Sequence, residues 1–161
     1  MDVGIIGTGA MGKNHVRVYS ELKSVGDVLV YDINAAAASD VAKNTGTNAA
    51  DSLEDLFRQV DAVSICVPTQ YHFETALKSA EAGVHMLIEK PVCLKSADAK
   101  ALCKKIPDEL VVGVGHIERF NPIVEEIRRI VTDPLYVEIK RHNPASMRIT
   151  GSSVVEDLMI H

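Results

Sequence analysis

Apolar residues occur along this chain in short unbroken runs, separated by stretches in which apolar residues recur with helical spacing. The runs predict β-strands at Val3–Ile6, Val28–Tyr31, Ala62–Val67, Val84–Ile88 and Leu110–Val114. They are continuous rather than alternating, which is typical of strands covered on both faces. We therefore expect a sheet buried between two layers.

Helical patterns lie between these runs. They predict helices over residues 11–23, 35–44, 52–58, 73–82 and 96–105. Asn34, Ser52 and Ser96 are the expected N-caps, and Gly46 and Gly83 the expected stops. Strands that alternate with helices in this way predict an α/β fold with a parallel sheet and right-handed crossovers.

The pattern changes after Gly115. Residues 121–131 read as a helix and Leu135–Arg141 as an alternating strand, whereas 143–153 are turn-rich and 154–161 form an apolar tail. We predict a first domain over residues 1–118 and the beginning of a second, truncated α/β domain over residues 119–161.

Composition narrows the class of protein. Of the 161 residues, 47% are apolar and 24% charged, which is ordinary for a soluble globular protein and excludes wholesale disorder. A net charge of −5 without a basic run argues against nucleic acid or an anionic membrane as a partner. The three cysteines form no C-x-x-C pair and no metal cluster, so we expect no metal and free thiols in the cytoplasm. No window is long and apolar enough for a transmembrane helix, and no signal peptide is expected.

A glycine motif directly follows the first predicted strand and opens the first predicted helix: Gly7-Thr8-Gly9-Ala10-Met11-Gly12. This is the G-x-G-x-x-G pattern in the context that dinucleotide binding requires. Gly7 permits a tight turn, Gly9 lets the backbone approach a pyrophosphate, and Gly12 allows close packing of helix on sheet. The motif predicts a cofactor loop in a Rossmann-type doubly wound parallel sheet; the alternative is a glycine-rich turn without a ligand.

Asp32 ends the second predicted strand, with Ile33 after it, about 20 residues beyond Gly12. A carboxylate at this position accepts hydrogen bonds from the adenosine ribose and repels a 2′-phosphate. Asp32 and Ile33 are therefore predicted to bind NAD in preference to NADP. Methyltransferases also combine a glycine loop with a strand-end acid, so S-adenosylmethionine remains a competing ligand.

Two further strand ends carry candidate residues. Val67 ends the run 62–67 and is followed by Pro68, Thr69 and His72, and Glu89 and Lys90 follow the run 84–88. Carboxyl ends of strands line the crevice of open α/β sheets, so we expect these residues to contact the cofactor. From the residues alone, His72 could equally be a capping or surface residue, and Glu89-Lys90 a solvated pair at a turn.

Together these motifs resemble the Gfo/Idh/MocA oxidoreductases. The matching segments are Gly7–His15, Pro68–His72, Glu89–Pro91, Gly115–Pro122 and Asp157–His161. They cover nearly the whole chain in the family's order. The sequence of residues 115–122 is similar to that of the family branch that acts on nucleotide sugars, such as UDP-N-acetylglucosamine 3-dehydrogenases.

The resemblance implies hydride transfer from a secondary hydroxyl of a sugar or cyclitol to nicotinamide. By the family's pattern, Lys90 polarises the hydroxyl, His161 is the general acid/base and Asp157 supports His161. Lys90, Arg119 and His161 are the implied substrate-binding residues, and the complete enzyme is expected to be a homo-oligomer. We read His15, on the first helix, as structural.

The family continues into a larger second domain, so the resemblance leaves two readings of this chain. The first is the cofactor-binding portion of an NAD-dependent sugar dehydrogenase. The second is a non-catalytic nucleotide-binding module, such as a sensor or a subunit completed by another chain.

Overall fold

The computed structural model describes residues 1–140, and Asp157, His161 and the other residues after 140 lie outside this part. The chain divides into two units, Met1–Gly115 and the residues from His116 onward. The boundary that we predicted after residue 118 falls within the short 3-10 helix η2 (Ile117–Phe120) and stays a prediction. In the described residues no helix is long and apolar enough to cross a bilayer.

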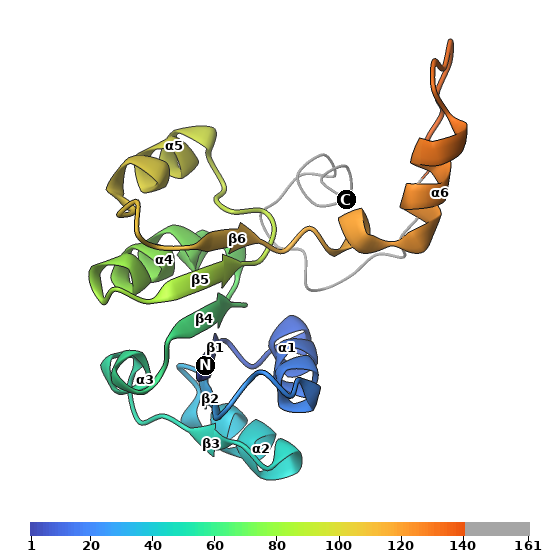
Figure 1. The fold of residues 1–161 in the computed structure, drawn as a ribbon. Helices are drawn as coiled ribbons and strands as arrows, with labels where there is room; N and C mark the ends of the chain where they lie inside the picture. The colour runs from blue at the N-terminus through green and yellow to red at the C-terminus, as the bar shows by residue number, and fades with distance from the viewer. Residues whose placement is uncertain (141–161) are drawn as a thin grey trace. The chain divides into compact units, whose positions relative to one another are not determined.

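The first unit is built on a parallel six-stranded sheet (Figure 1). Its strands, in chain order, are β1 (Val3–Ile6), β2 (Val28–Tyr31), β3 (Asn48–Ala49), β4 (Ala62–Ile65), β5 (His85–Ile88) and β6 (Val112–Val114). They lie in the order β3-β2-β1-β4-β5-β6, and all pairs are parallel. The order reverses between β1 and β4, which is the topological switch of a doubly wound fold. The predicted α/β class is confirmed.

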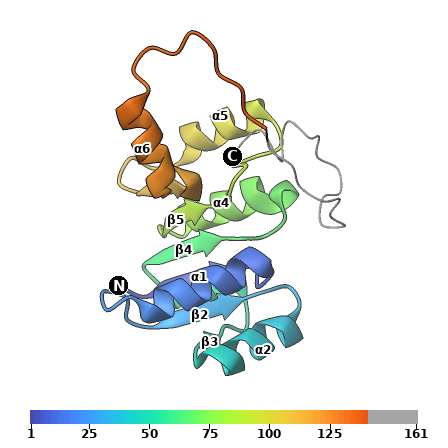
Figure 2. The ribbon, with the colours of Figure 1, turned by 90° about the vertical axis from the view of Figure 1, so that its right-hand side faces the viewer.

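Helices cover both faces of this sheet. They are α1 (Ala10–Glu21), α2 (Ala35–Thr45), α3 (Leu53–Gln59), α4 (His72–Glu81) and α5 (Ser96–Lys105), with the 3-10 helix η1 (Thr69–Tyr71) before α4. Helices α3, α4 and α5 lie on one side of the sheet in Figure 1, and α1 and α2 on the other. In Figure 2 helix α1 runs across the middle of the sheet, between β2 and β4.

The core is correspondingly split between the two faces. On one face, Leu56 of α3, Ala76 of α4 and Leu102 of α5 pack against Ile65 and Ile88. On the other face, residues of α1 and α2, among them Val16, Ala38 and Val41, pack against alternate residues of β1 and β2, which are Val3, Ile5, Val28 and Val30. Continuous apolar runs therefore form these strands because both of their faces are buried.

The helix ends explain one correction. The side chains of Asn34 and Ser52 each accept a hydrogen bond from the amide three residues later, as expected of N-caps. Gly46 ends α2 with a φ of +70°. Ser96, however, is the first residue of α5 and not its N-cap. The carbonyl of Lys95 accepts hydrogen bonds from the amides of Asp98 and Ala99. Lys95 is therefore the N-cap of α5, and the Ser96 hydroxyl does not cap the helix.

Strand β3 was missing from the prediction. Asn48 and Ala49 are exposed and only two residues long, so no apolar run marks them. They pair with Leu29 and Val30 of β2. Tertiary pairing rather than local pattern therefore creates this edge strand.

The second unit contains η2 and helix α6 (Pro122–Ile130), which agrees with the predicted helix. The predicted strand Leu135–Arg141 is wrong where it can be compared. Residues 135–140 form no strand, and Leu135, Tyr136 and Ile139 are largely exposed. A strand needs a neighbour for its N–H and C=O groups, and the described residues of this unit offer none. Arg141 lies outside the described residues.

Candidate functional site

The glycine loop connects β1 to α1 and has the shape that its glycines require. Gly7 has a φ of +95°, and an added Cβ would lie 2.9 Å from the backbone of Cys66. A Cβ on Gly12 would lie 1.9 Å from the carbonyl oxygen of Gly7, so only glycine lets α1 start this close to the strand. Gly9, in contrast, faces open space with nothing within 4 Å.

Gly9 is also the N-cap of α1, and no side chain caps this helix. The first-turn amides at Ala10 and Met11 are therefore the ones that an anion could use, aided by the positive end of the helix dipole. Tight packing at Gly7 and Gly12 with open space at Gly9 is the cradle that a pyrophosphate fits.

Asp32 lies at the end of β2 and is fixed by this loop. Its Oδ2 accepts hydrogen bonds from the Thr8 amide (2.7 Å) and the Thr8 hydroxyl (2.9 Å), and its Oδ1 accepts from the Asn34 amide (2.9 Å). Burial raises the pKa of Asp32, but these three bonds outweigh burial and leave the pKa lowered. The neighbouring Ile33 is 96% exposed. The carboxylate is thus ionised and oriented, with lone pairs left for a ribose.

The loop after β4 contains Val67, Pro68 and Thr69 and leads into α4, which begins at His72. His72 is not a surface residue: its main chain ends η1 as the C-cap, while its side chain is buried with both ring nitrogens close to main-chain carbonyls. Nδ1 lies 2.8 Å from the Pro91 oxygen and Nε2 lies 2.8 Å from the Val67 oxygen. This ring joins the loops after β4 and β5, and its contact with a cofactor stays a prediction.

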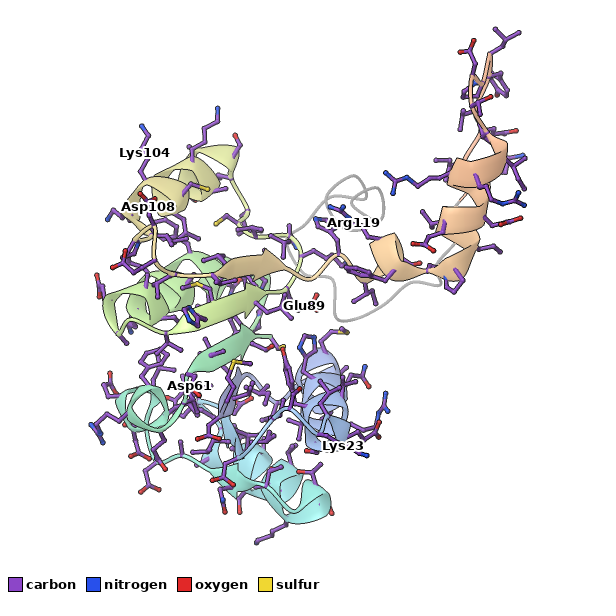
Figure 3. All side chains as sticks on the ribbon, viewed as in Figure 1. Lys23, Asp61, Glu89, Lys104, Asp108 and Arg119 are labelled. Carbon is purple, nitrogen blue, oxygen red and sulfur yellow. The ribbon has the colours of Figure 1, made fainter. Side chains whose placement is uncertain are left out.

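Glu89 follows β5, where Figure 3 shows it past the end of the strand. It is buried, so the solvated Glu-Lys turn is the wrong interpretation for Glu89. Its Oε1 lies 3.0 Å from Nε2 of His15, and its Oε2 accepts from the Lys90 amide at 3.2 Å. Burial raises the pKa of Glu89, but the His15 hydrogen bond and the charges of His15 and Lys90 lower it, and the net pKa is lowered.

Behind His15 stand two residues that the sequence analysis missed. Nδ1 of His15 lies 3.1 Å from the Ser64 hydroxyl, which lies 3.0 Å from the Tyr19 hydroxyl. The available signal was Ser64 itself, a polar residue inside the apolar run of β4. The same environment raises the pKa of the nearby Cys66 thiol to about 12, through burial and the charge of Glu89, so this thiol is unreactive.

These groups meet at one edge of the sheet. The glycine loop follows β1, Asp32 follows β2, Val67 follows β4 and Glu89-Lys90 follows β5. Parallel strands bring their carboxyl ends together, and this edge at the switch point is where open α/β sheets bind dinucleotides. Arg119 belongs to the second unit, where it is exposed in η2, and Asp157 and His161 lie outside the described residues.

Known proteins share this sequence and fold. A UDP-N-acetylglucosamine 3-dehydrogenase from Acidithiobacillus ferrooxidans is 38% identical over 163 residues, which cover 100% of this chain and 51% of that protein. A 4-carboxy-2-hydroxymuconate-6-semialdehyde dehydrogenase from a Sphingobium species is 35% identical over 145 residues, or 86% of this chain and 45% of that protein. This chain thus spans about half the length of the curated relatives it matches.

A solved structure of the Acidithiobacillus enzyme superposes with a TM-score of 0.74, covering 80% of this chain and 42% of that one. Residues 1–116 match the model of an oxidoreductase family described by its NAD-binding Rossmann fold. That description favours NAD over S-adenosylmethionine as the cofactor. With most of its length covered by this match, the chain belongs to the Gfo/Idh/MocA oxidoreductase family.

Proposed function

We propose that this chain is the cofactor-binding part of an NAD-dependent dehydrogenase that oxidises a secondary hydroxyl of a sugar, nucleotide sugar or cyclitol. The observation that carries the proposal is the alignment of the glycine loop, Asp32 and Glu89-Lys90 at the carboxyl ends of one sheet. The 38% identity to a UDP-N-acetylglucosamine 3-dehydrogenase favours a nucleotide sugar as substrate.

In this proposal the first half of the sheet holds the adenosine and pyrophosphate. The open space at Gly9 and the uncapped amides of α1 accept the pyrophosphate. Asp32 binds the ribose hydroxyls, and its lowered pKa keeps it ionised near neutral pH, where it repels a 2′-phosphate. NAD is therefore preferred to NADP.

The half of the sheet that contains β4 and β5 holds the nicotinamide end of the cofactor and the reacting hydroxyl of the substrate. Bound NAD⁺ would supply the hydride acceptor, so that the alcohol would lose one hydride and one proton and become a ketone. Lys90 hydrogen-bonds the hydroxyl and stabilises negative charge that develops on its oxygen. His161 takes the proton. Asp157, four residues before His161 in the sequence, orients the imidazole. Arg119 contributes to substrate binding.

The cofactor is tested first by thermal melts of the 161-residue chain with NAD, NADP and S-adenosylmethionine. A ligand at 100 times its Kd adds about 2.7 kcal/mol of stability, which raises Tm by roughly 5–10 °C for a chain of this size. We expect the largest rise with NAD. A rise with S-adenosylmethionine alone, or none with any ligand, contradicts the proposal.

The reaction is tested by Lys90→Ala in the complete protein, with UDP-N-acetylglucosamine and myo-inositol as probes. Turnover should fall on the order of a hundredfold, while the Kd for NAD changes little. The matched control is Lys78→Ala, which removes an exposed lysine paired with Glu74 on α4. Unchanged turnover in Lys90→Ala would remove this residue from the mechanism.

A non-catalytic nucleotide-binding module is the other candidate function. It predicts that the complete protein binds NAD but forms no NADH with any sugar or cyclitol. Substrate-dependent absorbance of NADH separates the two functions.

The predicted homo-oligomer is a proposal as well. Ile123, Ile127 and Ile130 share one side of α6 by their spacing and are all more than half exposed. Light scattering of the complete protein gives its oligomeric state.

A further inference from the structure

The proposed mechanism assigns no step to the buried carboxylate of Glu89. Glu89 is the single carboxylate among the buried residues of positions 1–140, with 7% of its surface exposed. A buried charge is costly unless it is paired and hydrogen-bonded. The surroundings of Glu89 therefore indicate what the charge is for.

Three elements close around this carboxylate. His15 approaches from α1, the Lys90 amide comes from its own loop, and Gly115 follows β6. A Cβ on Gly115 would lie 2.7 Å from Oε1 of Glu89, so the absence of a side chain there leaves room for the carboxylate. Ser64 and Tyr19 hydrogen-bond behind His15 and hold its ring. The charge is thus held at a defined place and is not free to turn into solvent.

The arrangement Ser64–His15–Glu89 has the connectivity of a nucleophilic triad, but it does not work as one. Ser64 is 0% exposed, in the middle of β4, so no substrate can reach its hydroxyl. The Ser64 hydroxyl instead hydrogen-bonds Nδ1 of His15, and Nε2 of the same ring faces Glu89. The network acts on the carboxylate and not through the serine.

Charge explains the position of this carboxylate. In a doubly wound sheet the dinucleotide lies across the switch point, so with Asp32 on the adenosine half, Glu89 belongs to the nicotinamide half. The oxidised nicotinamide ring carries a positive charge, and the reduced ring is neutral. Lys90 and the N-terminus of α1 are also positive at this edge. A cationic ring there needs a counter-charge.

We propose that Glu89, positioned by His15, is the counter-charge of the nicotinamide ring and makes this crevice bind oxidised cofactor in preference to reduced cofactor. This inference rests on the proposed NAD-binding function and adds a redox preference to it. His15 is then a positioning residue, which acts on the cofactor through Glu89.

The test measures the Kd of NAD⁺ by calorimetry and of NADH by fluorescence, near neutral pH, for the 161-residue chain and its variants. In Glu89→Gln the ratio of the NADH Kd to the NAD⁺ Kd should fall at least tenfold, which is the effect of removing a unit charge roughly 12 Å away at an effective dielectric constant of about 20. Almost all of the change should come from weaker NAD⁺ binding. The matched control, Glu21→Gln, removes an exposed carboxylate from α1 and should leave the ratio unchanged.

His15 is tested by two variants that treat the hydrogen bond differently. His15→Leu removes the donor and should lower the ratio a few-fold, whereas the amide of His15→Gln can still donate to Glu89 and should restore most of it. A merely structural role would weaken both cofactor forms equally and leave the ratio unmoved. If Glu89→Gln does not fold, the two His15 variants decide by the same criterion.

The outcomes separate the inference from the function beneath it. If the unaltered chain binds neither NAD⁺ nor NADH, the proposed function fails and the inference fails with it. If it binds both and the Glu89 and His15 variants leave the ratio unchanged, the inference alone is overturned.

Discussion

Asp32 and Glu89 are two acidic residues at the ends of β2 and β5, and the protein keeps both ionised by different means. Asp32 is partly exposed and receives hydrogen bonds from the amides of Thr8 and Asn34 and from the Thr8 hydroxyl. Glu89 is buried and receives its main bond from a side chain, His15, which is itself held by Ser64 and Tyr19. A short loop suffices for the first carboxylate, whereas the second needs a helix and a strand brought together by folding.

The difference fits what each carboxylate faces in the proposed enzyme. Asp32 meets neutral ribose hydroxyls, for which an open, oriented acceptor is enough. Glu89 faces a group whose charge changes during the reaction, and a charge inside the protein acts more strongly than one in water. Variants that disturb one carboxylate and spare the other test this comparison.

The largest effect on stability and NAD binding is expected when the groups that hold Asp32 and Glu89 are displaced together. In Gly12→Ala the new methyl group meets the carbonyl oxygen of Gly7, so α1 must move, and Thr8 and His15 move with the loop and helix. Overpacking of this kind costs about 1–3 kcal/mol, and Tm should fall by several degrees with loss of NAD binding.

Gly9→Ala is the matched control for that change. Its Cβ meets nothing within 4 Å, and the residue has an ordinary φ of −66°. Its Tm should stay unchanged while NAD binding weakens, because the methyl group occupies space meant for the pyrophosphate. A Gly12→Ala protein with normal stability and normal NAD affinity would contradict the close approach of α1 to the strand.

Asp32→Ala should break the adenosine side alone. Hydrogen bonds to a charged group are worth about 1.5–3 kcal/mol, so the Kd for NAD should rise by roughly ten- to a hundredfold, and the preference over NADP should shrink. The ratio of NAD⁺ to NADH affinity should hold, since Glu89 is untouched. Calorimetric titration with the three cofactors measures all of this, and an unaltered NAD/NADP ratio would show that Asp32 does not read the ribose.

These two carboxylates also show how far the sequence reaches. The strand end, the glycine loop and the spacing to Asp32 are local features. They were enough to predict the position of Asp32, although not its hydrogen bonds with Thr8. Glu89 was predicted as a site residue by its place after a strand, but its burial was not, since a Glu-Lys pair before proline reads as a solvated turn. The side-chain partner of Glu89 is His15, and His15 is held in turn by Ser64; no local pattern connects these three positions.

The errors have the same origin. Strand β3 exists because Leu29 and Val30 offer it a partner, and the strand predicted at Leu135 does not form among the described residues, where no partner adjoins it. A periodic pattern describes one strand, but a sheet needs two. The helices, whose backbone bonds are internal, were predicted to within a few residues.

Acid should sharpen the comparison. Both carboxylates have a lowered pKa in the folded protein, so each stabilises the fold at pH values above its ordinary pKa near 4, and this stability is lost as the pH falls through the lowered folded pKa. We expect the unfolding free energy to decline below about pH 4 and to change little between there and neutrality through these two groups.

Urea unfolding at a series of pH values measures this decline, and variants assign it. Glu89→Gln and Asp32→Asn should each flatten the acid limb, because each removes a carboxylate whose pKa is lowered in the folded protein. A variant whose acid limb matches that of the unaltered chain would show that its carboxylate does not contribute to the decline.

The smallest effect should come from Thr8→Val, which keeps the shape of the side chain and the amide bond to Asp32 but removes the hydroxyl bond of 2.9 Å. The carboxylate then has one anchor fewer on Oδ2 and turns more freely, so the NAD/NADP affinity ratio should fall a few-fold, in keeping with one hydrogen bond among three. Thr8→Ser restores the hydroxyl and should restore the ratio, whereas the NAD⁺/NADH ratio should not respond to either change. If Thr8→Val moved the NAD⁺/NADH ratio instead, the two carboxylates would not be independent, and the loop would transmit changes from the adenosine half of the sheet to the nicotinamide half.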